Sequence, residues 1–155
     1  MLLPAAECED DMSIKQISVF LENKAGSMLE LTRTLAEKGI DMRALSLAEA
    51  SDFGIVRLIT KDVFEASTVL KEAGFIYSIT PVIGVCIPDE AGGLNKVLET
   101  LNDAFINVEY MYAFLGNISA NEAYMIFHVQ DPKAASSALR ARGVKLLDQE
   151  DIEKL

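Results

Sequence analysis

Apolar and polar positions alternate in two short stretches of the chain, at residues 17–21 and 83–87. In ISVFL and IGVCI every second side chain is aliphatic, which is typical of a strand that buries one face. After each stretch, apolar residues recur at helical spacing, starting from Met28 and from Leu94, as on the buried face of an amphipathic helix. Each pattern therefore predicts a strand, a loop and a helix, in that order.

The two stretches belong to an internal repeat. Residues 17–26 (ISVFLENKAG) align with residues 83–92 (IGVCIPDEAG), and residues 61–75 align with residues 130–144 after an insertion near 116–122. A repeat has to be recognised first because it sets the architecture of the whole chain. The sequence therefore predicts two similar units of about 70 residues each.

Signals for helix ends complete the order of elements in each unit. Aspartate or proline favours a helix start, and glycine in a left-handed conformation favours a helix end. Strands are expected at about 41–49 and 53–60, and a short last strand follows the second helix of a unit. The residues that predict helix ends are Gly39, Asp62, Gly74, Asp131, Pro132 and Gly143.

The resulting order β-α-β-β-α-β, found twice, predicts an α+β fold. A split β-α-β unit crosses right-handed, so both helices pack on one face of a four-stranded antiparallel sheet. This arrangement is the ferredoxin-like architecture. We expect an N-terminal tail at residues 1–13, a first unit at 14–81 and a second unit at 82–155.

The charge of the chain narrows the choice of partners. With 24 acidic and 14 basic residues the net charge is −10, whereas nucleic acids and anionic membranes are bound by clustered lysine and arginine. No apolar run approaches the roughly 20 residues that span a bilayer. The N-terminal stretch MLLPAAECEDDM lacks the basic start of a signal peptide. We therefore expect a cytoplasmic protein that binds neither nucleic acid nor membrane.

The sequence offers no catalytic constellation. Its one histidine, His128, lies in a predicted strand, where we expect a packed or surface residue. Cys8 and Cys86 lack the spacing of a metal site, and we expect Cys86 to be a small core residue. Neither a nucleophile elbow nor a phosphate-binding glycine loop is present. We predict no enzyme activity, no metal site and no cofactor.

The loop between the predicted first strand and first helix has the same form in both units. It reads NKAG at residues 23–26 and DEAG at residues 89–92. N–H groups at a helix N-terminus can hold a carboxylate, and glycine allows close approach of a ligand. Asn23 or Asp89 can accept hydrogen bonds from an ammonium group. The pattern fits a free α-amino acid; the alternative is that Asn23 caps a helix and that Gly26 only permits a turn.

The strand, the loop N/D-x-x-G, the helix after it and the segments ALSLAEASDFGIVRLIT and NVEYMYAF resemble the ACT domain family. The resemblance extends from about residue 14 to residue 155 and is to stand-alone tandem ACT proteins. It implies a regulatory protein that binds a free L-amino acid and acts on a separate metabolic enzyme. Exposed sheet edges also lead us to expect a homodimer.

The resemblance implies ligand sites at an interface where sheets pair side by side. Each site lies between the loop of one unit and the start of the second strand of its neighbour. The chain has Ala25 and Ala91 where the family loop usually has proline. One implied site is Asn23, Ala25, Gly26, Ser27 and Met28 with Asn107 and Val108, and the other is Asp89, Ala91, Gly92, Gly93 and Leu94 with Asp41 and Met42.

Two tyrosines of the segment EYMYAF share one face of its predicted strand. Strand alternation places Tyr110 and Tyr112 together, either over a ligand side chain or in an interface between sheets, and we favour the interface. Met111 and Phe114 are expected in the core. An alternative function is a non-catalytic oligomerisation module that binds no ligand.

Overall fold

The structure is a computed structural model that describes residues 13–114 and 121–155; most of the predicted tail, including Cys8, lies outside these ranges. The first unit contains β1 (Ile14–Glu22), α1 (Ser27–Glu37), β2 (Met42–Ala50), β3 (Phe53–Thr60) and α2 (Val63–Glu72). The strand β4 (Ile76–Pro88) leads into α3 (Gly93–Asp103), β5 (Val108–Ala113), β6 (Glu122–Val129), α4 (Pro132–Ala141), β7 (Lys145–Leu147) and α5 (Gln149–Lys154).

The predicted helix ends are confirmed. The side chain of Asp62 accepts a hydrogen bond from the backbone N–H of Glu65 at 2.9 Å, and Asp131 accepts one from Ala134 at 3.0 Å. Pro132 occupies the start of α4. Glycines follow α1, α2 and α4 with φ between 68° and 82°, which is the left-handed conformation expected there. The short α5, which the sequence pattern did not predict, begins with a capping box.

The strand β4 is shared by the two units. Its first half, Ile76–Val82, pairs with β1, and its second half, from Ile83, pairs with β6 and β7. The last strand of the first unit is longer than the short strand predicted, because β4 continues past Pro81 for a total of 13 residues. Proline is tolerated in a strand whose outer edge is unpaired, and within the described chain no other strand pairs with Ile76–Val82. The predicted boundary after residue 81 thus falls inside a continuous strand.

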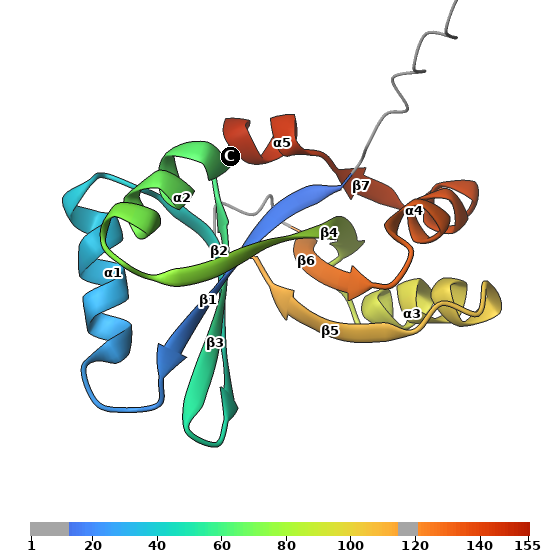
Figure 1. Cartoon of the computed structure of the whole chain (residues 1–155). Helices are drawn as coiled ribbons and strands as arrows, with labels where there is room; N and C mark the ends of the chain where they lie inside the picture. The colour runs from blue at the N-terminus through green and yellow to red at the C-terminus, as the bar shows by residue number, and fades with distance from the viewer. Residues whose placement is uncertain (1–12, 115–120) are drawn as a thin grey trace, which may run out of the picture.

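The helices lie on the outside and the strands between them (Figure 1). The sheet order is β2-β3-β1-β4-β6-β5, with β7 beside β4. Helices α1 and α2 cover one half of this curled sheet, and α3 and α4 cover the other half. Ala44 of β2 and Phe114, just after β5, form a bridge between the two sheet edges. Within the chain the two units therefore join through β4 and curl toward each other, whereas the resemblance implied sheets paired side by side.

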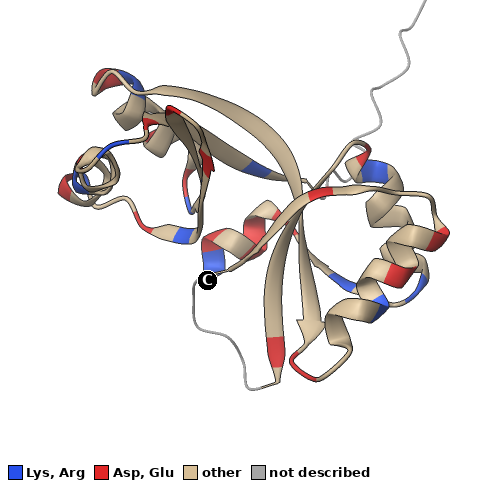
Figure 2. Cartoon of the chain, turned by 90° about the horizontal axis from the view of Figure 1, so that it is seen from below, with Lys and Arg blue, Asp and Glu red and all other residues tan. Residues whose placement is uncertain are grey.

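An apolar cluster fills the space between the helix-free faces of the two units. It combines residues of both units with Ile152 of α5. Charged residues lie mainly on helices and loops (Figure 2), and β4 (IYSITPVIGVCIP) contains none. The principal members of this interface are Ile14, Ala44, Ile59, Val82, Cys86, Tyr112, Phe114, Tyr124, Ile126 and Leu147.

Burial of both faces of β1 is the main departure from the predicted strand pattern. Gln16 is 0% exposed and lies between the units. Its Nε2 donates to Ser18 at 3.0 Å and to the Tyr110 hydroxyl at 2.8 Å, and the Tyr112 hydroxyl donates to its Oε1 at 2.8 Å. The prediction that Tyr110 and Tyr112 pack an interface between sheets is confirmed, as is the buried position of Phe114.

Tyr110 is also held on both sides of its ring. The guanidinium carbon of Arg57 lies 3.7 Å from the ring centroid, and the His128 ring stacks with its centroid at 4.6 Å. The Nδ1 atom of His128 lies 2.6 Å from a carboxylate oxygen of Glu109. His128 is therefore a packed residue at the junction of the two units, as expected for a lone strand histidine.

Candidate functional site

The helices that follow the two repeated loops begin without a side-chain cap. Gly26 precedes α1 with φ 92°, and Gly92 precedes α3 with φ 84°. By contrast, the other three described helices each have an aspartate cap. The first-turn N–H groups of α1 and α3 therefore receive no acceptor from a capping side chain, and they carry the positive end of the helix dipole. Such an end can hold a carboxylate.

Asn23 does not cap α1. Its Nδ2 donates to the backbone oxygen of Ser51 at 3.0 Å, and its backbone N–H donates to Asp52 at 3.0 Å. The backbone N–H of Asp89 makes the corresponding bond, to Asn121, at 2.8 Å. Both loops are thus tied to the turn between the second and third strands of their own unit. The Asn23 amide oxygen stays available as an acceptor.

The predicted second halves of the sites lie elsewhere in the chain. Val108 pairs with Val129 in the second unit, and Met42 pairs with Thr60 in the first unit. The preceding residues, Asp41 and Asn107, are both exposed. The loop before α1 and the start of β5 lie at different ends of the molecule (Figure 1). Within one chain the structure brings together the loop residues 23–28, and separately 89–94, but does not join them to these strand starts.

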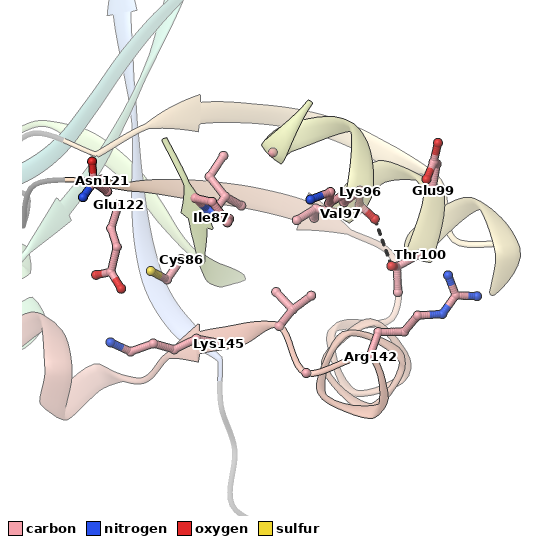
Figure 3. A pocket seen from close by; sticks show the side chains of 14 residues that line it. Cys86, Ile87, Lys96, Val97, Glu99, Thr100, Asn121, Glu122, Arg142 and Lys145 are labelled. Atoms are coloured by element: carbon pink, nitrogen blue, oxygen red, sulfur yellow. Dashed lines mark hydrogen bonds between the residues drawn. The ribbon is translucent and has the colours of Figure 1, made fainter. Parts of the chain in front are cut away.

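A pocket of about 740 Å³ opens next to the second loop (Figure 3). It follows the edge of β4 beyond the point where β7 ends, between α3 and the turn from α4 into β7. Gly93 is the one predicted site residue in its wall. The lining residues are Cys86, Ile87, Pro88, Gly93, Lys96, Val97, Glu99, Thr100, Asn121, Glu122, Arg142, Gly143, Val144 and Lys145.

Cys86 is buried at 7% exposure, as predicted for a small core residue, but it also borders this pocket. Burial, and secondarily the carboxylate of Glu122, raise the pKa of its thiol from the ordinary 9.0 to about 11. The folded chain thus holds this proton more tightly than the unfolded chain does. The contribution of the thiol to stability is present below pH 9 and declines as the pH rises from about 9 to about 11.

Alkylation of Cys86 by iodoacetamide should be slow at pH 8 because the thiolate is the reactive form. We expect the rate to rise about tenfold per pH unit as the pH approaches the raised pKa. Intact-mass measurements on a Cys8→Ser background would follow this single thiol. Glu122→Gln should speed the reaction at pH 8, since it removes a neighbouring negative charge. A rate that levels off below pH 9 would contradict the assigned environment.

Sequence reasoning found the loops but missed the pocket. The pocket forms where the chain lacks bulky side chains, and a missing side chain leaves no motif. Alignment of the two repeats could have found it, because aromatic positions of the first unit become small or charged in the second. Over the described ranges, no three histidine, cysteine, aspartate or glutamate side chains gather as a metal site requires. None of the described helices is long and apolar enough to cross a membrane.

Comparison with known proteins gives a family and a fold. The model of the family described as "ACT domain pair" matches residues 12–155. A crystal structure of a protein from Bacteroides thetaiotaomicron has a TM-score of 0.85 and 38% identity, over 93% of this chain and 98% of that chain. No curated protein sequence matches.

Regulatory subunits of aspartate kinase share the fold. The ligand-free subunit from Thermus thermophilus has a TM-score of 0.61 and 16% identity, over 84% of this chain and 93% of that chain. The subunit from Thermus flavus has a TM-score of 0.58 and 18% identity over the same shares. At these identities the likeness is one of fold.

Proposed function

The chain belongs to the ACT domain pair family, and on this basis we propose that it is a regulatory protein that binds a free amino acid. The observation that carries the proposal is the pair of uncapped helix starts at Gly26 and Gly92, whereas the other described helices are capped by aspartate. Two copies of this geometry, each preceded by an amide or carboxylate side chain, favour a recurrent ligand over a local accident.

In the proposed sites, the ligand carboxylate binds the first-turn N–H groups of α1 or α3, where the helix dipole stabilises negative charge. The ammonium group donates to the Asn23 amide oxygen or to the Asp89 carboxylate. Asp89 carries a charge and Asn23 does not, so the second loop is expected to bind the ammonium group more strongly. Neither interaction involves the side chain of the ligand.

A second copy of the chain would complete each site. Because one chain does not join the loops to Asp41–Met42 or Asn107–Val108, we propose a homodimer in which these strand starts face the loops of the partner. Ligand binding then favours one arrangement of the units by its differential affinity. The fold shared with regulatory subunits of aspartate kinase supports the proposal that this protein regulates a separate metabolic enzyme. We place this protein in the cytoplasm.

A thermal-shift panel with each of the twenty L-amino acids at about 1 mM tests the proposal. A ligand present at 100 times its Kd and binding only the folded state stabilises it by about 2.7 kcal/mol. We expect a shift for one amino acid or a few related ones. The double variant Asn23→Ala, Asp89→Ala should lose that shift, because it removes both ammonium acceptors.

The matched control is Asp62→Ala with Asp131→Ala. These changes remove the caps of α2 and α4, at about 1 kcal/mol each, and leave both loops intact. The control should melt at a lower temperature and still respond to the ligand. A full response in the Asn23, Asp89 variant would refute the loop assignment.

An oligomerisation module without ligand is the second candidate. It is favoured by apolar side chains on the helix-free face at the far end of the first unit. Phe20 is 40% exposed, Phe53 45% and Ile76 71%, and Phe20 pairs directly with Ile76 across β1 and β4. A stable oligomer whose melting responds to no amino acid would establish this alternative.

A further inference from the structure

The two units differ at corresponding positions around one end of their sheets. Strand pairing identifies these positions: Phe20 is opposite Ile76 in the first unit, as Cys86 is opposite Lys145 in the second. Phe53 is opposite Glu22 at the start of β3, as Glu122 is opposite Pro88 at the start of β6.

The residue after the glycine that ends the second helix of each unit is also smaller in the second unit. Phe75 follows Gly74 in the first unit, and Val144 follows Gly143 in the second. Three phenylalanines and an isoleucine of the first unit thus correspond to two smaller and two charged side chains. All four residues of the second unit line the pocket of about 740 Å³. The replacements reduce side-chain volume at Cys86 and Val144 and introduce charge at Glu122 and Lys145.

Some charged residues that line the pocket form ion pairs, and others do not. At the C-terminal end of α3, Arg142 forms an ion pair with Asp103 at 2.7 Å, and at its N-terminal end Lys96 forms one with Glu90 at 3.3 Å. Glu122 and Lys145 belong to no ion pair with any residue that the structure describes. Glu122 accepts a 3.2 Å hydrogen bond from the Tyr124 hydroxyl and also contacts the Cys86 thiol.

Figure 3 shows Cys86, Glu122 and Lys145 on one side of β4 and Ile87 and Val97 on the other, and the pocket is lined from both sides. Three charged lining residues thus have no ion-pair partner among the described residues: Glu99, which accepts a hydrogen bond from Asn95 at 2.7 Å, and Glu122 and Lys145, which lie together at one end of a pocket whose other side is apolar. A zwitterion with an apolar substituent matches this arrangement in charge and polarity. The volume is within the range of small-molecule sites, about 300–1,000 Å³.

We propose that this pocket binds a free α-amino acid with a large apolar side chain, within a single chain. Glu122 accepts from the ammonium group, Lys145 donates to the carboxylate, and the side chain lies along Ile87, Val97 and Val144. The proposal rests on the proposed function for the ligand class only. It uses a different site from the loops and needs no second copy.

Isothermal titration calorimetry with L-leucine, L-methionine and L-phenylalanine tests the pocket, and the best binder is carried forward. Val144→Phe should weaken its binding at least about tenfold, because the larger ring would occupy the space of the ligand side chain. This variant introduces the residue that the first unit has at the corresponding position, Phe75. Glu122→Gln and Lys145→Met should each weaken binding about tenfold by removing one charge partner.

Ligand analogues that lack one of the two charged groups of leucine test the same interactions. Isoamylamine lacks the carboxylate of leucine, and 4-methylpentanoate lacks the ammonium group. Each should bind at least about tenfold more weakly than L-leucine if both charges are recognised. If Val144→Phe fails to fold, the charge variants and these analogues still decide the question.

Asp62→Ala, which removes the cap of α2 in the first unit and touches neither candidate site, is the control. Unchanged binding in Asp62→Ala together with loss in Val144→Phe and both charge variants supports the pocket. Wild-type binding in the pocket variants, with loss on Asn23→Ala, Asp89→Ala, overturns the pocket and leaves the proposed function standing. Absence of binding by any amino acid in the wild type overturns both.

Discussion

Replacing Gln16 with leucine should lower the free energy of unfolding by several kcal/mol, because it removes the partner of two tyrosine hydroxyls and of the Ser18 hydroxyl, at about 1–3 kcal/mol for each buried group left unpaired. Gln16 is 0% exposed and bonds both Tyr110 and Tyr112 across the two units. Leucine fills a similar volume, so the loss reports the hydrogen bonds rather than a cavity. Urea unfolding, followed by circular dichroism, measures the change.

The triple variant Gln16→Leu, Tyr110→Phe, Tyr112→Phe is the control for this interpretation. It removes the two tyrosine hydroxyls together with their partner, which in other buried sites is nearly neutral, and leaves only the Ser18 hydroxyl without its bond from Gln16. We expect it to recover most of the stability, and the ring contacts of Arg57 and His128 remain possible with phenylalanine. Equal losses in the single and triple variants would mean that Gln16 stabilises the junction by packing alone.

Gly93→Ala is expected to cost about 1–3 kcal/mol, the usual range for forcing extra volume into a packed site. A Cβ at this position would lie 2.2 Å from the backbone oxygen of Pro88. A backbone atom cannot rotate away as the end of a side chain can, so the loop itself has to move. Differential scanning calorimetry should show a lower melting temperature, and ligand response should weaken because Gly93 lines the pocket.

Ser27→Ala is the matched control for Gly93→Ala. Ser27 occupies the corresponding position at the start of α1 and already carries a Cβ. Ser27 is buried in the first turn of α1, and alanine keeps its Cβ while adding no volume, so we expect a change well below that of Gly93→Ala. Gly93→Ala with wild-type stability would show that the second loop is less tightly packed than the structure indicates.

The element order was predictable because its signals are local. Helix periodicity, the aspartate caps and the glycine ends act within one turn, and the repeat doubled each of them. Burial by the other unit was not predictable from alternation, because Gln16 and Ser18 have the polarity of an exposed face. They are buried through partners far away in sequence, as the bond from Gln16 to Tyr110 shows.

The candidate site likewise has a part that the sequence predicts and a part that it does not. The loops at 23–26 and 89–92 have a visible pattern, and their uncapped helix starts follow from glycine at the cap position. Whether a second chain faces them depends on assembly, and this part stays a prediction. The pocket was missed because Cys86 and Val144 matter there through their small size, and the effect of size depends on which strands and turns lie next to them.

The single strand β4 determines how the halves of this molecule can move. No linker lies between them, since the pairing passes from β1 to β6 between the neighbouring residues Val82 and Ile83. A change in their relative orientation is therefore a change in the torsion of one continuous ribbon. Cys86 and Pro88, a few residues further along this ribbon, border the pocket. A ligand in the pocket would therefore contact the same strand whose torsion sets the angle between the halves.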